Sequence, residues 1–278
     1  MLQSAPLSEP AASGAIVVRR AESLAEFAEC VAIQEETWGA GFSERVPASV
    51  LLVTQKIGGV VAAAFAPEGR MLGFVFGLTG VVDGELVHWS DLLAVRPEAR
   101  GTGIGERLKC YQRDLVRGMG VDVMCWTFDP LVARNAHLNL ARLGARATQY
   151  VPNMYGNTGS PLHGAVDTDR LVASWDLGGD APPPASARPR PGVVVNPPDG
   201  DELPTLDGLP DADVVRIAVP RDVHSLALDR RGAWRAATRA AFTVYLGRGY
   251  EVLGFQRGDG VELPYYELAR TAATERAR

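Results

Sequence analysis

The sequence predicts a mixed α/β fold, and three observations carry that prediction. The 278 residues are 46% hydrophobic and 22% charged, which is ordinary for a globular protein and enough for a large core. Short runs rich in Val, Ala and Phe alternate with segments whose apolar residues recur at helical spacing. A Pro- and Ala-rich segment, residues 178–192, separates a long N-terminal part from a shorter C-terminal part.

Capping residues and glycines set the bounds of the helices predicted in the N-terminal part. Ser23 and Glu26 form a capping-box pattern at the start of a helix that reaches Trp38. Two further helices span residues 103–119 and 133–143, and each ends at a glycine. The predicted strands cover residues 15–19, 59–65, 71–78, 85–95, 121–128, 145–151 and 170–175. This order predicts a mixed sheet and not a regular βαβ array.

The C-terminal part predicts a strand at 214–219, a helix at 229–247, and strands at 250–256 and 264–269. The last four elements of the N-terminal part have the same order, so we expect a partial structural repeat. The domain plan is a flexible tail at 1–14, a larger domain at 15–177, a linker at 178–192 and a smaller α/β extension at 193–278.

Charge and composition exclude several classes of protein. The net charge is −5 and no block of Lys and Arg is present, so nucleic acid is not expected as a partner. The N-terminus lacks the pattern of a secretory signal, and no apolar stretch is long enough to span a membrane. The three cysteines are widely spaced, which predicts neither a disulfide framework nor a metal site. These features predict a cytoplasmic protein.

One stretch, residues 93–105, predicts a binding site for a pyrophosphate. A strand leads into the glycine-rich turn that contains Gly101 and Gly103, and a helix follows at once. Glycines allow close approach of the backbone, and the N-terminus of a helix offers free N–H donors to an anion. A P-loop is excluded because Glu106 and Arg107 follow the last glycine, where that motif needs Lys and Ser or Thr.

The residues around this turn resemble the acyl-CoA signature of the GNAT superfamily of acyltransferases. Its core, Arg/Gln-x-x-Gly-x-Gly/Ala, corresponds here to Arg100, Gly103 and Gly105. A second stretch, 127–145, is similar to a GNAT subfamily of predicted acyltransferases with a C-terminal extension. That subfamily has a Trp-Arg-x-x-Thr-Arg pattern in its extension, and residues 234–239 match it.

The resemblance implies a GNAT fold with a splayed central sheet, and an extension that resembles half of a GNAT unit. The pantetheine of an acyl-CoA cosubstrate would lie between residues 92–95 and 124–128, with its thioester near Leu93 and Trp126. No metal is implied. The residues expected to bind the cosubstrate are Leu93, Ala94, Val95, Arg100, Gly101, Thr102, Gly103, Ile104, Gly105 and Asn135.

The catalytic residues are less clearly marked. Many GNAT enzymes carry a tyrosine that protonates the leaving thiolate, and counting back from Gly144 places Leu140 in that position. Tyr150 and Tyr155 are the replacement candidates, although each could equally be a packed aromatic. Asn139 is expected to hydrogen-bond the pantetheine or the substrate.

A proton acceptor is expected on the strand that enters the glycine turn. His88, Ser90 or Asp91 could relay a proton from the amine, and Asp91 should face opposite to the other two. A buried structural histidine is the alternative interpretation of His88. We therefore expect His88, Asn139 and Tyr155 to serve catalysis.

Three arginines recur every four residues on the helix of the extension: Arg231, Arg235 and Arg239. A solvated charged face is one interpretation of this stripe. The other is that Arg235 and Arg239 bind an anionic group such as a substrate carboxylate. Trp126 is also expected to contact the substrate. The extension could reach the pocket in its own chain or in a homodimer.

The sequence thus predicts an enzyme that transfers an acetyl or other acyl group, succinyl included, from coenzyme A to a primary amine of a small molecule. The absence of a clear strong base favours an α-amino acceptor such as an amino acid, because about a tenth of such amines is neutral at pH 7. Two alternatives stay open: a noncatalytic acyl-CoA-binding module, and an acetyltransferase of protein N-termini or lysines.

Overall fold

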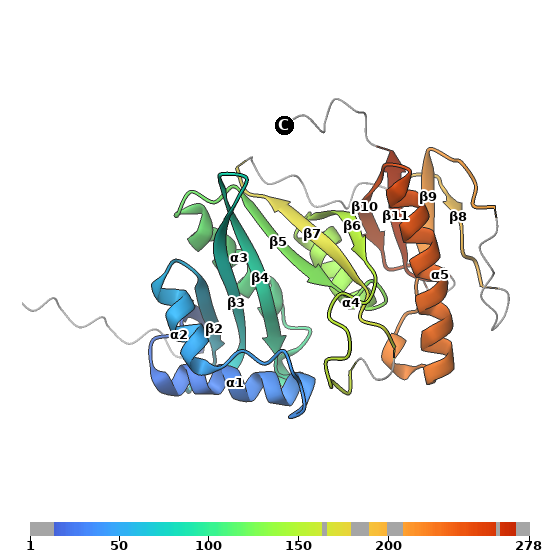
Figure 1. Cartoon of the computed structure of the whole chain (residues 1–278). Helices are drawn as coiled ribbons and strands as arrows, with labels where there is room; N and C mark the ends of the chain where they lie inside the picture. The colour runs from blue at the N-terminus through green and yellow to red at the C-terminus, as the bar shows by residue number, and fades with distance from the viewer. Residues whose placement is uncertain (1–13, 163–165, 179–188, 199–207, 260–261, 271–278) are drawn as a thin grey trace, which may run out of the picture.

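The computed structural model describes residues 14–162, 166–178, 189–198, 208–259 and 262–270. Within these ranges the chain forms one 11-stranded sheet in the order β1-β2-β3-β4-β5-β7-β6-β10-β11-β9-β8 (Figure 1). The predicted mixed α/β fold is confirmed, and both parts of the chain supply strands to the same sheet. Most of the predicted tail and linker, residues 1–13 and 179–188, lies outside the described residues.

The N-terminal part alternates strands and helices much as predicted. Its strands are β1 (Val17–Arg20), β2 (Val60–Phe65), β3 (Met71–Val82), β4 (Glu85–Val95), β5 (Val123–Phe128), β6 (Arg146–Val151) and β7 (Arg170–Asp176). Its helical elements are α1 (Leu24–Trp38), α2 (Ala48–Lys56), the short η1 (Pro97–Ala99), α3 (Ile104–Arg117) and α4 (Ala133–Ala136), which continues as the π-helical η2 (His137–Arg142).

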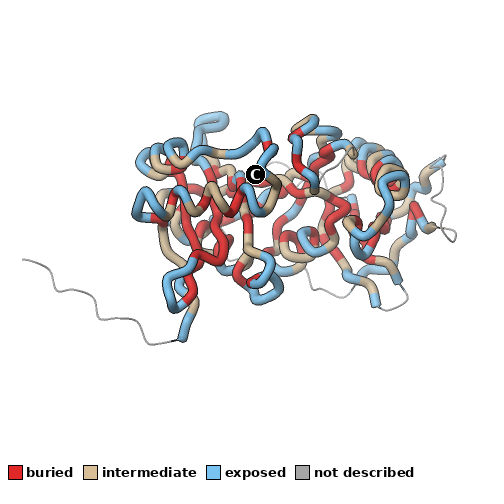
Figure 2. Tube along the Cα trace, turned by 90° about the horizontal axis from the view of Figure 1, so that it is seen from below, coloured by how far each residue is buried: buried red, intermediate tan, exposed pale blue. Residues whose placement is uncertain are grey.

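The helices cover both faces of this half of the sheet, and β2 shows why. Val61 and Ala63 pack with α1 and α2, whereas Val60 and Ala62 pack in the cluster that contains α3. Successive side chains of a strand point to opposite faces, so α1 and α2 lie on one face and α3 on the other. Buried residues accordingly follow the strands, and exposed ones the outer helical surfaces and loops (Figure 2).

Strand β4 carries a bulge in its pairing with β3, just past the point where its pairing with β5 ends. Ser90 pairs with Gly77 and Leu92 with Phe76 on β3, so Asp91 is the extra residue. On its other edge β4 runs parallel to β5, but it pairs only over Val87–Trp89. Beyond Trp89 the two strands separate, although β4 continues to Val95. This is the splayed arrangement that the resemblance implied.

The C-terminal part contains β8 (Val193–Val194), β9 (Val214–Ala218), η3 (Val223–Ser225), α5 (Leu228–Gly247), β10 (Tyr250–Gln256) and β11 (Tyr265–Arg270). Strand β9 pairs with β11 and β11 with β10, both antiparallel. In the same way β5 pairs with β7 and β7 with β6. Strands β6 and β10 join the two units antiparallel to each other. The predicted repeat is thus present in the connectivity of the sheet.

Three elements differ from the predictions. Helix α2 was not predicted, because its apolar pattern is weak. In the structure only Leu51 and Thr54 of its nine residues, all of them described, are buried. The strand expected at 71–78 extends to Val82 in a hairpin whose end is exposed. The helix expected at 133–143 is present, but its second half is a π-helical turn.

Candidate active site

The open gap between β4 and β5 is the centre of the candidate site. Its walls are the unpaired stretch of β4 after Trp89 and residues Trp126–Phe128 of β5. The backbone groups of these residues that face the gap have no partner strand there, while the other edge of β5 pairs with β7 throughout. An extended ligand that carries amide groups, as pantetheine does, would find free backbone donors and acceptors along both walls.

A glycine turn lies at the end of β4, at the N-terminus of α3. Gly101 and Gly103 have φ of 78° and 85°, and Gly103 is the N-cap of α3. A Cβ placed on either glycine would meet no chain atom within 4 Å, so the backbone there is open to a ligand. The first N–H groups of α3 lack helical acceptors and favour a negative charge. These features fit the pyrophosphate that the sequence predicts at this turn.

Two guanidinium groups lie near the turn. Arg100 donates from Nε to the carbonyl oxygen of Val95 at 3.0 Å. Burial and then the charge of Arg134 lower the pKa of Arg100, which indicates that the two cations lie close together. Such a pair is well suited to a multiply charged phosphate group. Asn135, also predicted to bind the cosubstrate, is exposed on α4 beside Arg134.

The remaining residues predicted for this site differ in their exposure. Thr102 is exposed and donates its hydroxyl to the carbonyl oxygen of Ala99 at 2.7 Å. Ile104 and Ala94 are buried, and Leu93 and Val95 are half-buried. Leu93 and Leu138 of η2 both lie within 4 Å of a Cβ built on Gly105, so an apolar contact borders the gap where α3 begins.

His88 lies on the α3 face, where its buried side chain contacts the half-buried Thr79 and the buried Gln112. Its Nδ1 is 2.9 Å from Thr79 Oγ1 and its Nε2 is 3.0 Å from Gln112 Nε2. Burial, and then the charge of Lys109, lower the pKa of His88 to about 4. The side chain is completely buried, so the structure supports a structural histidine and gives no support to the predicted proton relay by His88.

Asp91, the bulged residue of β4, is an exposed carboxylate on the opposite side. Partial burial is the largest cause of its raised pKa; a hydrogen bond with Trp89 lowers the pKa, and the charge of Glu44 raises it. Glu44 lies in the α1–α2 connection, so Asp91 faces the side of α1 and α2. The prediction that it faces opposite to His88 agrees with this position. A water-accessible carboxylate with a raised pKa is a suitable proton acceptor.

Two loops enclose this second face of the gap. The N–H of Ser43 in the α1–α2 connection donates to the carbonyl oxygen of Thr158 in the β6–β7 connection at 2.9 Å. Thr127 of β5 points to the same face, because Trp126 and Phe128 on either side of it pack in the α3 cluster. The Thr127 hydroxyl is 3.0 Å from the hydroxyl of Tyr155.

Tyr155 is therefore the predicted tyrosine that the structure brings to the gap. Tyr150 is not available, because its hydroxyl donates to Asp169 and its ring stacks on Phe242 at 5.4 Å. Burial and then Asp169 raise the pKa of Tyr150. Of the two tyrosines, only Tyr155 has its hydroxyl beside the splayed end of β5.

The π-helical turn η2 carries the other predicted catalytic positions. Leu140 is completely buried in the core, so its side chain does not reach the gap. Asn139 is 4% exposed, and its side-chain amide makes no hydrogen bond with the described part of the chain. π-Helical turns often occur at functional sites, so the role predicted for Asn139 stays a prediction.

Trp126 was predicted to contact the substrate, but the structure places it elsewhere. The indole is 3% exposed, faces α3, and packs edge-on against Trp175 with ring centroids 6.1 Å apart. The Lys109 ammonium lies 4.0 Å above its ring and donates to Ser90 Oγ at 2.7 Å. Burial lowers the pKa of Lys109 well below its usual value. Sequence reasoning did not find this buried lysine, although its spacing from Gln112 places both on one face of α3.

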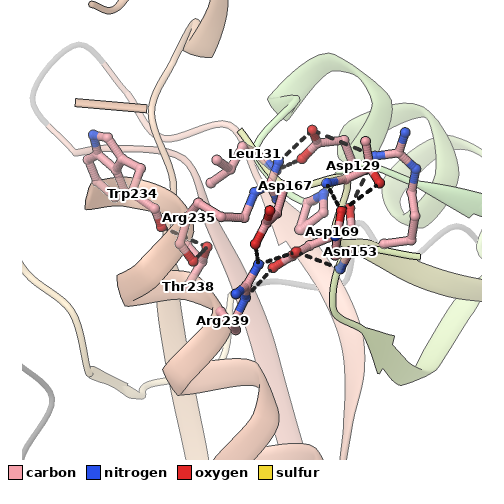
Figure 3. A network of polar contacts seen from close by, with 12 residues as sticks. Asp129, Leu131, Asn153, Asp167, Asp169, Trp234, Arg235, Thr238 and Arg239 are labelled. Atoms are coloured by element: carbon pink, nitrogen blue, oxygen red, sulfur yellow. Dashed lines mark hydrogen bonds and ion pairs between the residues drawn. The ribbon is translucent and has the colours of Figure 1, made fainter. Parts of the chain in front are cut away.

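Two arginines of α5, Arg235 and Arg239, form a network with aspartates of the N-terminal part of the chain (Figure 3). Arg235 donates from Nη2 to Asp129 Oδ2 at 2.7 Å. Arg239 binds Asp169 through Nε at 2.8 Å and through Nη2 at 2.6 Å, and Asp167 through Nη2 at 2.7 Å. Asp169 is buried, so the main partner of Arg239 is internal and not a substrate. Asp129 also accepts from the N–H of Leu131 at 2.8 Å, as the first residue of a turn would.

The described part of the chain offers no reactive cysteine, metal site or membrane-spanning helix as a competing functional feature. Burial raises the pKa of Cys30 to about 12 and is also the largest cause of the raised pKa of Cys110 and Cys125, so none is an activated thiolate. The described ranges hold no cluster of His, Cys, Asp and Glu suited to a metal ion. Within the same ranges no helix has the length and apolarity needed to cross a bilayer.

Solved structures with a similar arrangement are acetyltransferases. The ribosomal-protein-S18-alanine N-acetyltransferase of Escherichia coli is 16% identical over 60% of this chain and 96% of its own, with a TM-score of 0.46. Arabidopsis thaliana NAA60, in complex with a bisubstrate analogue, is 17% identical over 60% of this chain and 100% of its own, with a TM-score of 0.49. A chain of the NatC complex bound to Gag peptide and CoA is 17% identical over 58% and 98%, with a TM-score of 0.45. No family model and no curated protein matches the sequence.

Proposed function

We propose that this chain is a GNAT-type N-acyltransferase that moves an acyl group from coenzyme A to the primary amine of a small molecule. The observation that carries the proposal is the open gap between β4 and β5, which ends at the glycine turn and the N-terminus of α3. The edge of β4 that lacks a partner strand thus runs from the bulge at Asp91 to the glycine turn. An acyl-CoA has the same order of groups: pyrophosphate, amide-containing pantetheine and thioester.

In the proposed reaction, residues on the two sides of the gap supply the groups that thioester aminolysis needs. The amine nitrogen attacks the carbonyl carbon, a C–N bond forms, and the C–S bond breaks. Asp91 accepts the proton that the amine loses, and the Tyr155 hydroxyl donates a proton to the departing thiolate. Backbone N–H groups of β4 that face the gap stabilise the negative charge on the carbonyl oxygen. The products are an amide and the free thiol of coenzyme A.

A thiol-release screen tests the proposal. Acetyl-, succinyl- and longer acyl-CoAs are crossed with L- and D-amino acids, and with peptides as the comparison acceptor. We expect release of free thiol that depends on an amine, with free amino acids used better than peptides. Binding of acyl-CoA without amine-dependent release would show a noncatalytic module instead, and a preference for peptides would show a protein acetyltransferase.

A further inference from the structure

Arg235 is a buried cation with unused hydrogen-bond donors. The residue is 5% exposed, and only its Nη2 has a partner, Asp129. Its Nε and Nη1 are buried and have no acceptor in the described part of the chain. Buried guanidinium donors without partners are rare in folded proteins, since each one forfeits its bonds to water. Such donors indicate a place for an additional acceptor.

Arg235 lines a small cavity between the larger domain and the extension. The cavity volume is about 20 Å³, enough for a group the size of a water molecule, such as one oxygen of a carboxylate. Its walls come from three segments: the β5–α4 turn with Asp129, the β6–β7 connection with Asp167, and the η3–α5 segment with His224 and Arg231. The remaining described residues of the lining are apolar: Leu131, Leu162, Val166 and Val223. The arginine stripe of α5 therefore reaches this cavity through Arg231 and Arg235.

The cavity lining holds the carboxylates of Asp129 and Asp167 as well as Arg231 and Arg235, but both carboxylates are already paired with arginines. Arg231 donates from Nε to the carbonyl oxygen of Leu226 and from Nη2 to that of His224, so backbone carbonyls and not a carboxylate satisfy it. Asp167 is already paired with Arg239. Asp129 thus remains as the carboxylate for Arg235, and Arg170 lies 3.8 Å from the same oxygen of Asp129.

The cavity is connected to the candidate active site through Arg170. This arginine follows Asp169 at the end of the β6–β7 connection, and its guanidinium lies 5.4 Å from the centre of the Tyr155 ring. Asp129 follows Phe128, the last residue of the splayed strand β5. Arg170 thus contacts Tyr155 at the gap on one side and Asp129 in the cavity wall on the other.

We propose that this cavity receives a carboxylate group of the substrate and that Arg235 binds it through its unused N–H donors. The inference rests on the proposed acyltransferase function and narrows its substrates to those that carry a carboxylate. Two sources share this chemistry: the carboxylate of an amino-acid acceptor, and the free end of a dicarboxylic acyl chain on coenzyme A. The guanidinium recognises either one by charge-assisted hydrogen bonds.

Arg235→Lys is the informative variant. Lysine keeps a positive charge beside Asp129 but lacks the Nε and Nη1 donors, so it separates recognition from folding. Arg216→Lys is the matched control, because Arg216 lies in the extension and also has a buried Nε without an acceptor, but does not line the cavity. Thermal unfolding checks that both full-length variants are folded.

Thiol release then distinguishes the two sources. One arm uses acetyl-CoA and compares phenylalanine with phenylalanine amide; the other uses phenethylamine and compares succinyl-CoA with acetyl-CoA. We expect the wild type to prefer the carboxylate-bearing member in one arm. Arg235→Lys should reduce that ratio of kcat/KM by roughly ten- to a hundredfold, and Arg216→Lys should leave it unchanged. Loss in the first arm identifies the acceptor, and loss in the second identifies the acyl chain.

A preference absent from the wild type in both arms, or a preference that a folded Arg235→Lys retains, overturns the inference. If no pairing releases thiol, the proposed function fails, and calorimetry with succinate decides about the cavity. Succinate binding to the wild type and to Arg216→Lys but not to Arg235→Lys would support an anion site in a protein of other function. Absence of binding, or equal binding by all three proteins, would refute it.

Discussion

Gly103→Val tests the assignment of the glycine turn as the site for the pyrophosphate of coenzyme A. Gly103 has φ of 85°, so a valine there costs about 1–2 kcal/mol of stability for the left-handed backbone alone. A Cβ meets no chain atom within 4 Å, so no clash inside the protein adds to that cost. The side chain would instead occupy the open space in front of the first N–H groups of α3.

Gly120→Val is the matched control for this strain. Gly120 lies beyond the other end of α3, has φ of 81°, and also has no chain atom within 4 Å of a built Cβ. Both variants should therefore lose similar stability in thermal unfolding. Only Gly103→Val should weaken binding, because each charge-assisted contact to a phosphate is worth about 1.5–3 kcal/mol. One lost contact amounts to about tenfold or more in Kd.

Isothermal titration of acetyl-CoA into the three folded proteins measures this difference. The expected order is equal affinity for the wild type and Gly120→Val, and at least about tenfold weaker binding for Gly103→Val. Equal affinity in all three would show that the turn does not hold the cosubstrate. The reasoning from the open cradle would then be wrong, whatever the enzyme does.

Three further predictions concern catalysis and stability. Asp91→Asn should lower kcat/KM by about a hundredfold or more and should remove the acidic limb of the pH profile. In the wild type this limb should lie above the usual pKa of an aspartate, because the pKa of Asp91 is raised. An unchanged profile would exclude Asp91 as the base. Leu140→Tyr should give no large gain in kcat, since Leu140 is completely buried, and a rise of about a hundredfold would contradict this. Arg239→Met should lower the free energy of unfolding in urea by about 1.5–3 kcal/mol at pH 7. Burial raises the pKa of Asp169, but hydrogen bonds from Arg239, Tyr150 and the N–H of Asn153 bring it below the usual value. This stabilisation is therefore complete above the unfolded pKa of about 3.9 and is lost as the pH falls through the folded pKa, so a loss in Arg239→Met that persists in acid would contradict the ion pair.

Local patterns in the sequence were enough for much of the fold. The capping box at Ser23 is present, with Ser23 Oγ accepting from the N–H of Glu26 at 3.2 Å. The glycine turn and α3 also follow directly from neighbouring residues, because Gly101 and Gly103 adopt the backbone conformation that glycine favours. Helix α2 was not predicted because its sequence lacks such a local pattern. Its Val50 and Val53 are 44% and 52% exposed, so the sequence carries little periodicity.

The roles of individual site residues depended on contacts that sequence patterns do not contain. The bulge at Asp91 makes the α3 face receive His88 and Ser90 before it and Leu93 and Val95 after it. A simple alternation could not show this change of face. Arg239 seemed free on its helix, yet its partner Asp169 lies 70 residues away in the chain. Such non-local pairs become visible only in the folded structure.

The repeat in the sheet explains why one half of the protein has a ligand gap and the other does not. Strand β8 runs parallel to β9, as β4 does to β5. Beyond β8, Asn196 donates from Nδ2 to the carbonyl oxygen of Ala218 at 2.9 Å and accepts from the N–H of Ala218 at 2.7 Å. A fully buried amide side chain thus satisfies the strand edge that corresponds to the open edge of β5. At Ala218 the second unit therefore needs no ligand to complete its strand edge, and Arg235 of this unit lies at the junction with the first.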